Sequence, residues 1–157
     1  GKYTYQFNDP QYGKRFLLPE LANWGTKIAK IIERTIASNG PVFIYTNFLA
    51  SGIIPIAFAL EMNGFKRYKE HGNPLLENEF KDTNYKGDYI IYTGKSALSL
   101  HAEDYLNEGR NMIYNKNVKV FIGTSVASEG LNLFGYREVH ITDPWHNINL
   151  IEQALKE

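Results

Sequence analysis

Short apolar runs recur along this chain at regular intervals. Continuous runs occupy Val42–Tyr45, Tyr89–Tyr92 and Val118–Ile122, and a shorter one lies at Val139–Ile141. Runs of this length are typical of strands that are buried on both faces, as in a parallel sheet. Phe65–Tyr68 is compatible with one more short strand.

The stretches between these runs favour helices. One helix is predicted by apolar residues at helical spacing, with Asn39-Gly40 as its stop: Leu21, Trp24, Ile28, Ile31, Ile32 and Ile36. Three more are expected from Gly52 to Met62 with Pro55 in the first turn, from Ala102 to Tyr114, and after Asn147. Strands that alternate with helices predict βαβ units, and hence an α/β domain with a mainly parallel central sheet.

The length of 157 residues suits a single domain spanning 1–157. Residues 1–20 are interpreted as an N-terminal extension, and the polar stretch 69–87 as a surface insertion or long loop. No apolar run approaches the roughly 18 residues of a membrane span, so no membrane association is expected. The pattern of a secretory signal peptide is also missing.

Composition narrows the function classes further. The chain has no cysteine, which excludes a disulfide framework and a thiolate zinc site and favours an intracellular setting. Its formal net charge is +0, whereas dedicated nucleic-acid modules are often basic. Any contact with nucleic acid is therefore expected to be local, or shared with another domain.

Polar residues follow the predicted strands, where ligands of parallel sheets gather. These strand-end residues are Thr46, Asn47, Thr93, Gly94, Thr124, Ser125 and Asp143. Thr46 and Asn47 could bind a backbone phosphate or simply cap the following helix. Asp143-Pro144-Trp145 is interpreted as a turn with a packed aromatic ring.

The tripeptide Gly94-Lys95-Ser96 resembles the end of a phosphate-binding P-loop, but the rest of that motif is missing. A P-loop needs a glycine five residues earlier to wrap the phosphates, and that position is Tyr89, inside a predicted strand. The four histidines lack zinc-ligand spacing, and no nucleophile elbow is present. We therefore expect no catalytic residue and no metal site in this chain.

Three segments in order resemble the C-terminal domains of superfamily-2 helicases. GPVFIYTNFLASGIIPIAFALEMNGF (Gly40–Phe65) is similar to the motif IV strand and helix, and YIIYTG (Tyr89–Gly94) to the following strand with its Thr-Gly end. VKVFIGTSVASEGLNLFGYREVHITDPWHNINLIEQ (Val118–Gln153) is similar to the stretch from motif V to the start of motif VI. The amino-acid sequence of these segments is most similar to that of helicases of large DNA viruses, including poxvirus-type transcription helicases, and of Swi/Snf-like translocases.

The resemblance implies a RecA-like three-layer domain. In this family, an N-terminal RecA-like domain carries the P-loop and the Mg²⁺ ligands, and the two domains sandwich ATP and hold a DNA or RNA backbone. Nucleic acid would contact Thr46, Asn47, Thr93, Gly94, Thr124 and Ser125. ATP would contact Gly130, Asn132 and Gln153, with Asn132 at a position where many relatives have Asp. Glu129 lies in the same ATP-facing stretch, where many relatives have Arg or Gly, so a local structural role is also open.

The final residues depart from the family pattern. Motif VI continues beyond its Gln with Gly and Arg, but here Lys156 and Glu157 occupy those positions. The isolated chain is therefore expected to bind neither ATP nor Mg²⁺ on its own and to be inactive. Two other functions stay open: a degenerate RecA-like domain acting as a protein-interaction scaffold, and a different small α/β enzyme. The resemblance also implies an intracellular protein, in a virion or host cytoplasm if the source is viral.

Overall fold

The computed structural model describes residues 4–46, 52–93, 98–99, 117–123, 138–141 and 155–156. For 138–141 and 155–156 it describes the backbone only. Predictions that fall on the other residues, including the helix expected from Ala102 to Tyr114, lie outside the described part of the chain.

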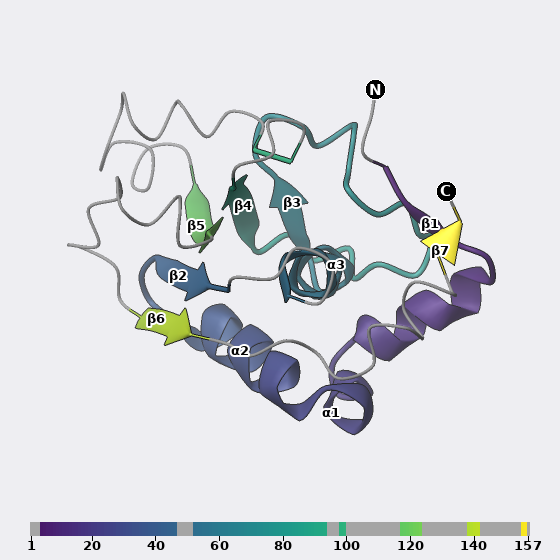
Figure 1. Ribbon diagram of the computed structural model, residues 1–157, viewed down its shortest axis with the longest axis horizontal. Helices are drawn as coiled ribbons and strands as arrows, with labels where there is room; N and C mark the ends of the chain where they lie inside the picture. Colours follow the sequence, from purple (N-terminus) through teal and green to yellow (C-terminus); the bar gives the residue numbers. More distant parts are fainter. Residues whose placement is uncertain are drawn as a thin grey trace.

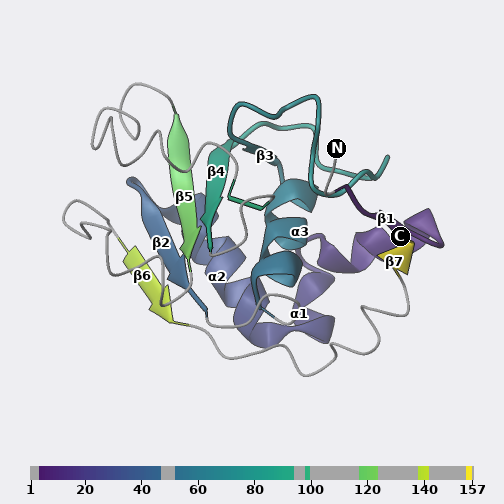
Figure 2. The same ribbon diagram turned by 45° about the horizontal axis from the view of Figure 1, so that its top comes forward.

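A five-stranded parallel sheet forms the centre of the domain, in the order β3-β4-β5-β2-β6 (Figures 1 and 2). The strands are β2 (Val42–Tyr45), β3 (Phe65–Arg67), β4 (Gly87–Tyr92), β5 (Val118–Gly123) and β6 (Glu138–Ile141). Each strand coincides with one of the apolar runs in the sequence. The prediction of an α/β fold of the RecA-like type, with a parallel central sheet, is confirmed.

One face of the sheet is covered by helices α1 (Leu21–Trp24), α2 (Thr26–Ala37) and α3 (Ile54–Met62), as Figure 2 shows. The amphipathic α2 buries Ile28, Ile31 and Ile32 against the sheet, whereas every residue of α3 is buried. The single helix predicted over Leu21–Ile36 is wrong in one respect. It is divided at Gly25, whose φ of −156° and ψ of 87° are not helical.

The opposite face of the sheet is also buried. Phe43, Ile90 and Phe121 point to this side, together with Val118 and Tyr68, and each is at most 4% exposed. Strands that are apolar on both faces require a cover on both sides. This burial is what a three-layer arrangement requires, although the helix predicted for the third layer lies outside the described residues.

The N-terminal segment packs against α3. It comprises β1 (Gln6–Phe7) and the 3-10 helix η1 (Pro10–Phe16). The Phe7 and Phe16 rings stack at a centroid distance of 5.6 Å, and both meet the Phe58 ring of α3 edge-on. Such pairs add stability beyond their buried area, so the segment is part of the core.

The C-terminal end of the chain corrects one prediction. The sequence predicts a helix that begins after Asn147 and extends to the chain end, but Leu155–Lys156 form strand β7, antiparallel to β1. Pairing with β1 satisfies the backbone of both short strands. Because the two strands are separated by almost the whole chain, local periodicity could not indicate this pairing. Across the portion of the chain with described helices, none is long and apolar enough to traverse a bilayer.

Candidate functional site

The carboxyl ends of three neighbouring strands meet at one edge of the sheet. Gly123 at the end of β5 is in register with both Tyr45 of β2 and Tyr92 of β4. The backbone N–H of Thr46 then donates a hydrogen bond of 3.0 Å to the carbonyl oxygen of Gly123. The segments that directly follow β2, β4 and β5 therefore all begin at the carboxyl-terminal side of the sheet, as the sequence predicts.

Thr46 lies inside this edge rather than on its surface. The residue is fully buried, and a Cβ atom added to Gly52 would come within 2.2 Å of the Thr46 hydroxyl. Gly52 lies just before α3, so its missing side chain lets the strand end pack tightly against the start of the helix. In this arrangement the Thr46 hydroxyl faces the protein, and a phosphate could reach it only after local movement.

Thr93 is held by a second hydroxyl. Its backbone N–H donates to Oγ of Ser99 at 2.7 Å, and that hydroxyl donates to the Thr93 carbonyl at 2.9 Å. The two hydroxyl oxygens are 3.3 Å apart. Sequence reasoning missed Ser99, whose one indication was a hydroxyl residue shortly after a strand. The half-buried Thr93 is thus fixed in place at the strand end.

The other predicted site residues lie outside the described part of the chain. They are Asn47, Gly94, Thr124, Ser125, Glu129, Gly130, Asn132 and Gln153. Strand β5 ends at Gly123, and Thr124 is the next residue in the sequence. Among the described residues, no group of three or more His, Asp or Glu side chains is placed to hold a metal ion.

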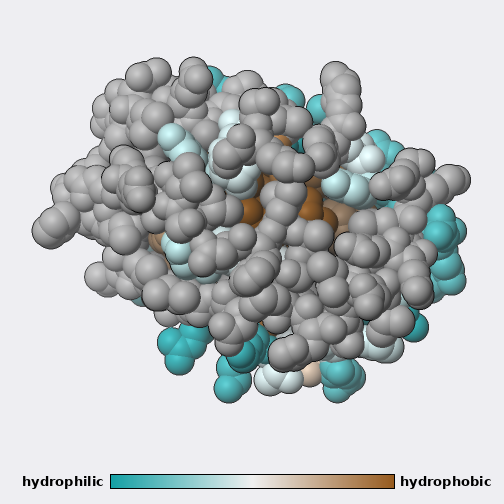
Figure 3. Space-filling model, in the orientation of Figure 1, coloured by the Kyte–Doolittle hydropathy of each residue, from teal (hydrophilic) through white to brown (hydrophobic). Residues whose placement is uncertain are grey.

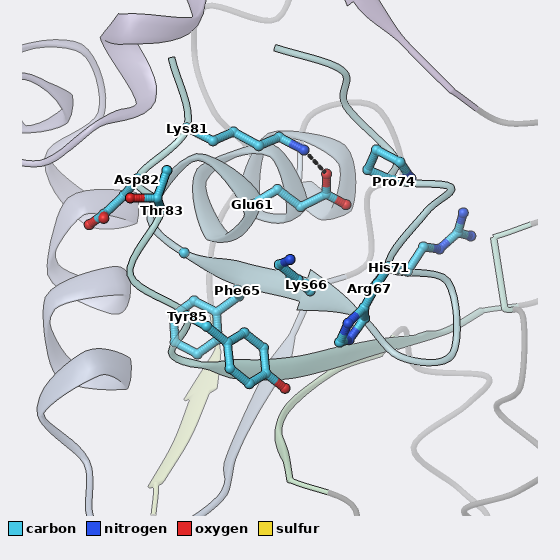
Figure 4. A pocket seen from close by; sticks show the side chains of 11 residues that line it. Glu61, Phe65, Lys66, Arg67, His71, Pro74, Lys81, Asp82, Thr83 and Tyr85 are labelled. Atoms are coloured by element: carbon cyan, nitrogen blue, oxygen red, sulfur yellow. Dashed lines mark hydrogen bonds and ion pairs between the residues drawn. The ribbon is translucent and has the colours of Figure 1, made fainter. Parts of the chain in front are cut away.

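A separate cavity of about 260 Å³ lies along the edge strand β3 (Figure 4). Helix α3 forms its back, and the loop that connects β3 to β4 closes its two sides. Glu61 of α3 anchors that loop. This buried carboxylate accepts hydrogen bonds from the backbone N–H groups of Leu75 at 2.9 Å and Leu76 at 3.1 Å, and pairs with Lys81 at 3.0 Å.

Tyr89 completes the environment of Glu61 by donating its hydroxyl to the carboxylate. Burial, followed by the negative charge of Glu61, raises the pKa of Tyr89 well above its ordinary value. The connecting loop was expected to be a surface insertion. It contains no helix, but Leu75 and Leu76 are fully buried beneath it, so the loop is in part a component of the core.

Asp88, at the start of β4, ties both ends of the loop to the sheet. It lies 2.7 Å from Nε2 of His71 and accepts a 2.7 Å hydrogen bond from the Tyr85 hydroxyl. Burial, and then this hydrogen bond, raise the pKa of Tyr85 to about 12. The cluster has no nucleophile beside a base, and its contacts are those of a structural network.

Comparisons with known proteins agree with the resemblance seen in the sequence. A protein of Acanthamoeba polyphaga mimivirus named as an ATP-dependent RNA helicase is 29% identical over 140 residues, or 88% of this chain and 22% of that protein. A second mimivirus protein of that name is 26% identical over 96% of the chain. An African swine fever virus protein named as a homologue of termination factor NPH-I is 26% identical over 78% of the chain and 21% of its own length.

The chain spans about a fifth of the length of these relatives. No protein-family profile matches the chain, and no solved structure matches it. Nevertheless, similarity that covers most of the chain, in proteins of two different viruses, agrees with the parallel sheet and with the order of the motifs. The chain is therefore a helicase-like domain, homologous to one segment of helicases and NPH-I homologues of large DNA viruses.

Proposed function

We propose that this chain is the C-terminal RecA-like motor domain of an ATP-dependent nucleic-acid helicase or translocase. The observation that carries the proposal is the shared edge at which β2, β4 and β5 end. The segments that resemble the helicase motifs follow these strand ends directly. A domain of this kind would contribute backbone contacts to a DNA or RNA strand and one side of an ATP site.

The strand-end residues take different parts in this proposal. Thr124 and Ser125 follow β5, and their hydroxyl and backbone N–H groups suit a backbone phosphate. Gly130 would let the chain approach the nucleotide phosphates closely, because it has no side chain. The Asn132 amide would bond to the ribose hydroxyls, and Gln153 would lie on the ATP side of motif VI.

Thr93 fits a supporting part at the same edge. Its fixed position next to Ser99 supports the assignment of the next residue in sequence, Gly94, to contact with a nucleic-acid strand. Thr46, being buried against Gly52, fits the shaping of the edge better than direct contact. Asn47 follows Thr46 and is the residue of this pair that we assign to nucleic acid.

Other parts of the active site would come from an N-terminal RecA-like domain. That domain would supply the P-loop and the carboxylates that hold Mg²⁺, which accompanies ATP as its metal complex. The sequence of the present chain contains no P-loop. We therefore assign it no hydrolysis of its own, and the N-terminal domain is its first partner.

A protein-interaction scaffold is the second candidate. The buried Thr46 and the Glu129 departure favour it, because both reduce the set of side chains available to ligands. Hydrolysis separates the two functions. In the two-domain protein, a motor releases phosphate from ATP faster when single-stranded nucleic acid is added, whereas a scaffold shows no such stimulation.

The matched variants are Gly130→Val and Gly72→Val. Valine at position 130 should abolish the stimulated phosphate release, because its side chain would block backbone approach to the nucleotide. Gly72 has open space around it, with no atom within 4 Å of an added Cβ, so Gly72→Val should preserve the rate. The motor function would be rejected if nucleic acid did not change the rate of phosphate release, or if the Gly130→Val protein were fully active.

A further inference from the structure

The helical side of this neutral chain carries an excess of positive charge. From the start of η1 to the end of α2, residues 10–37 include five basic and two acidic side chains, an excess of three positive charges. The basic residues are Lys14, Arg15, Lys27, Lys30 and Arg34. Figure 3 shows hydrophilic side chains along the lower and right-hand edges of the molecule, where α2 and η1 lie in Figure 1. The zero net charge of the chain therefore includes a local excess of positive charge in residues 10–37.

Arg15 has an unusual environment within this segment. Its guanidinium carbon lies 4.4 Å from the ring centroid of Tyr12 and 4.3 Å from that of Trp24. Two aromatic rings thus hold the planar group. Within the described part of the chain, Arg15 has no hydrogen bond or ion pair, and the residue is only half-buried. Its N–H donors are oriented in advance, and no acceptor among the described residues bonds to them.

Lys14 is held in a similar way. Its ammonium group lies 4.4 Å from the centroid of the Phe80 ring, and no carboxylate among the described residues pairs with it. The acidic residues nearest in sequence are engaged elsewhere or exposed. Asp9 accepts from the backbone N–H of Gln11 at 3.0 Å, and Glu20 is exposed at the start of α1. Two adjacent cations on η1 therefore lie over aromatic rings, and neither forms an ion pair with a carboxylate among the described residues.

We propose that Arg15, with Lys14 beside it, binds a backbone phosphate of a nucleic-acid strand. The planar fork of a guanidinium matches two phosphate oxygens, and aromatic contacts reduce the entropy lost when that fork is fixed. Phosphate contacts of this kind position a strand without reading its sequence. The proposal deepens the proposed function, on which it rests, by adding a contact outside the strand-end residues.

The experiment uses the whole chain and a fluorescently labelled single-stranded oligonucleotide, without ATP. Anisotropy is measured at several salt concentrations for the wild type, Arg15→Gln and Lys66→Gln. Lys66 is the matched control, because it is exposed on the distant edge strand β3 and also has no hydrogen bond or ion pair among the described residues. Melting temperatures show whether each variant remains folded.

Arg15→Gln should weaken binding about tenfold at low salt, the loss expected for a charge-assisted contact. It should also reduce the slope of log K against log salt by about 0.7, the value for one phosphate contact on a single strand. Arg15→Lys should restore the slope but not the full affinity, because lysine keeps the charge and loses the fork. Lys66→Gln should behave as the wild type.

Equal affinities and slopes for Arg15→Gln and Lys66→Gln would overturn the proposal. Competition by polyglutamate as effective as that by the oligonucleotide would also overturn it, in favour of an acidic protein partner. The outcome is distinguishable from that of the ATP assay. If the two-domain protein shows nucleic-acid-stimulated ATPase but Arg15→Gln binds the oligonucleotide as the wild type does, this contact alone is rejected. If Arg15→Gln weakens binding but the two-domain protein shows no stimulated ATPase, only the motor function is rejected.

Discussion

Glu61 is the one charged residue in an otherwise apolar helix, and it is 2% exposed. A buried carboxylate is costly unless its oxygens are hydrogen-bonded and its charge is paired. Here backbone donors, Lys81 and Tyr89 all converge on it. Since Leu75, Leu76 and Lys81 belong to the β3–β4 connection, this single side chain attaches the connection to the core.

Glu61→Gln should therefore destabilise the domain by about 3 kcal/mol, a value at the lower end for a broken buried ion pair. The neutral amide leaves Lys81 unpaired and turns an NH₂ group toward groups that are themselves donors. Urea denaturation gives the free energy of unfolding. The control is Glu77→Gln, an exposed residue that accepts from Gln6 at 3.1 Å and should change stability by less than about 0.5 kcal/mol. A similar small effect of Glu61→Gln would contradict the anchoring role.

Tyr85 gives the domain an alkaline sensitivity. Its pKa is raised from the ordinary 10.0 to about 12 by burial and by the hydrogen bond to Asp88. The folded state thus keeps a proton that the unfolded chain releases earlier. The resulting stabilisation is complete below pH 10 and disappears as the pH rises to about 12. In denaturation at several pH values, wild-type stability should fall more steeply over this interval than that of Tyr85→Phe, and parallel curves would refute the prediction.

At the scale of elements, the turn between α3 and β3 depends on a glycine. Gly64 has a φ of +101°, and a Cβ atom there would meet the Asn84 carbonyl oxygen at 2.2 Å. Gly64→Ala should lower the free energy of unfolding by about 2 kcal/mol, since it combines a left-handed backbone with a clash. Gly72→Ala, in open space, should be neutral or slightly stabilising. Equal midpoints in urea for the two variants would show that the turn can relax.

The strands and helices could be predicted where local periodicity decides the structure. The apolar runs of β2, β4 and β5 can only be buried within a sheet. Helix α3 has Pro55 in its first turn and ends at Met62, as the sequence predicts. The division at Gly25, the burial of Leu75 and Leu76, and the β1–β7 pairing could not be predicted. The burial of Leu75 and Leu76 and the β1–β7 pairing depend on contacts between segments that are distant in sequence.

The candidate site was predictable in position but not in detail. Parallel strands place their carboxyl ends together, so the alignment of Tyr45, Tyr92 and Gly123 follows from the fold class. The orientation of each hydroxyl does not follow. Thr46 is buried because Gly52 leaves space for it, and Thr93 is bound by Ser99. Neither partner has a spacing that identifies it in the sequence.

At the scale of the whole molecule, the domain presents surfaces of different character. The strand ends of β2, β4 and β5 lead into the segments assigned to ATP and nucleic acid, whereas η1 and α2 carry the basic excess. The two surfaces share one core, in which α3 contacts both η1 and α2. In the proposed motor domain, a nucleic-acid strand bound at both surfaces would be held at two separate points on one body.

This organisation predicts that the chain alone binds single strands but does not hydrolyse ATP. Binding should be weak, independent of sequence and sensitive to salt, because it depends on a few phosphate contacts in a neutral chain. Hydrolysis needs a P-loop, Mg²⁺ ligands and arginines at the γ-phosphate, and an arginine finger by itself contributes roughly 10³–10⁵ in rate. Phosphate release by the chain should therefore stay at background, with or without nucleic acid. It should appear when an N-terminal RecA-like domain and a complete motif VI are joined to the chain. Robust turnover by the 157 residues alone would refute the motor-domain assignment, because that assignment gives this chain only one side of the ATP site.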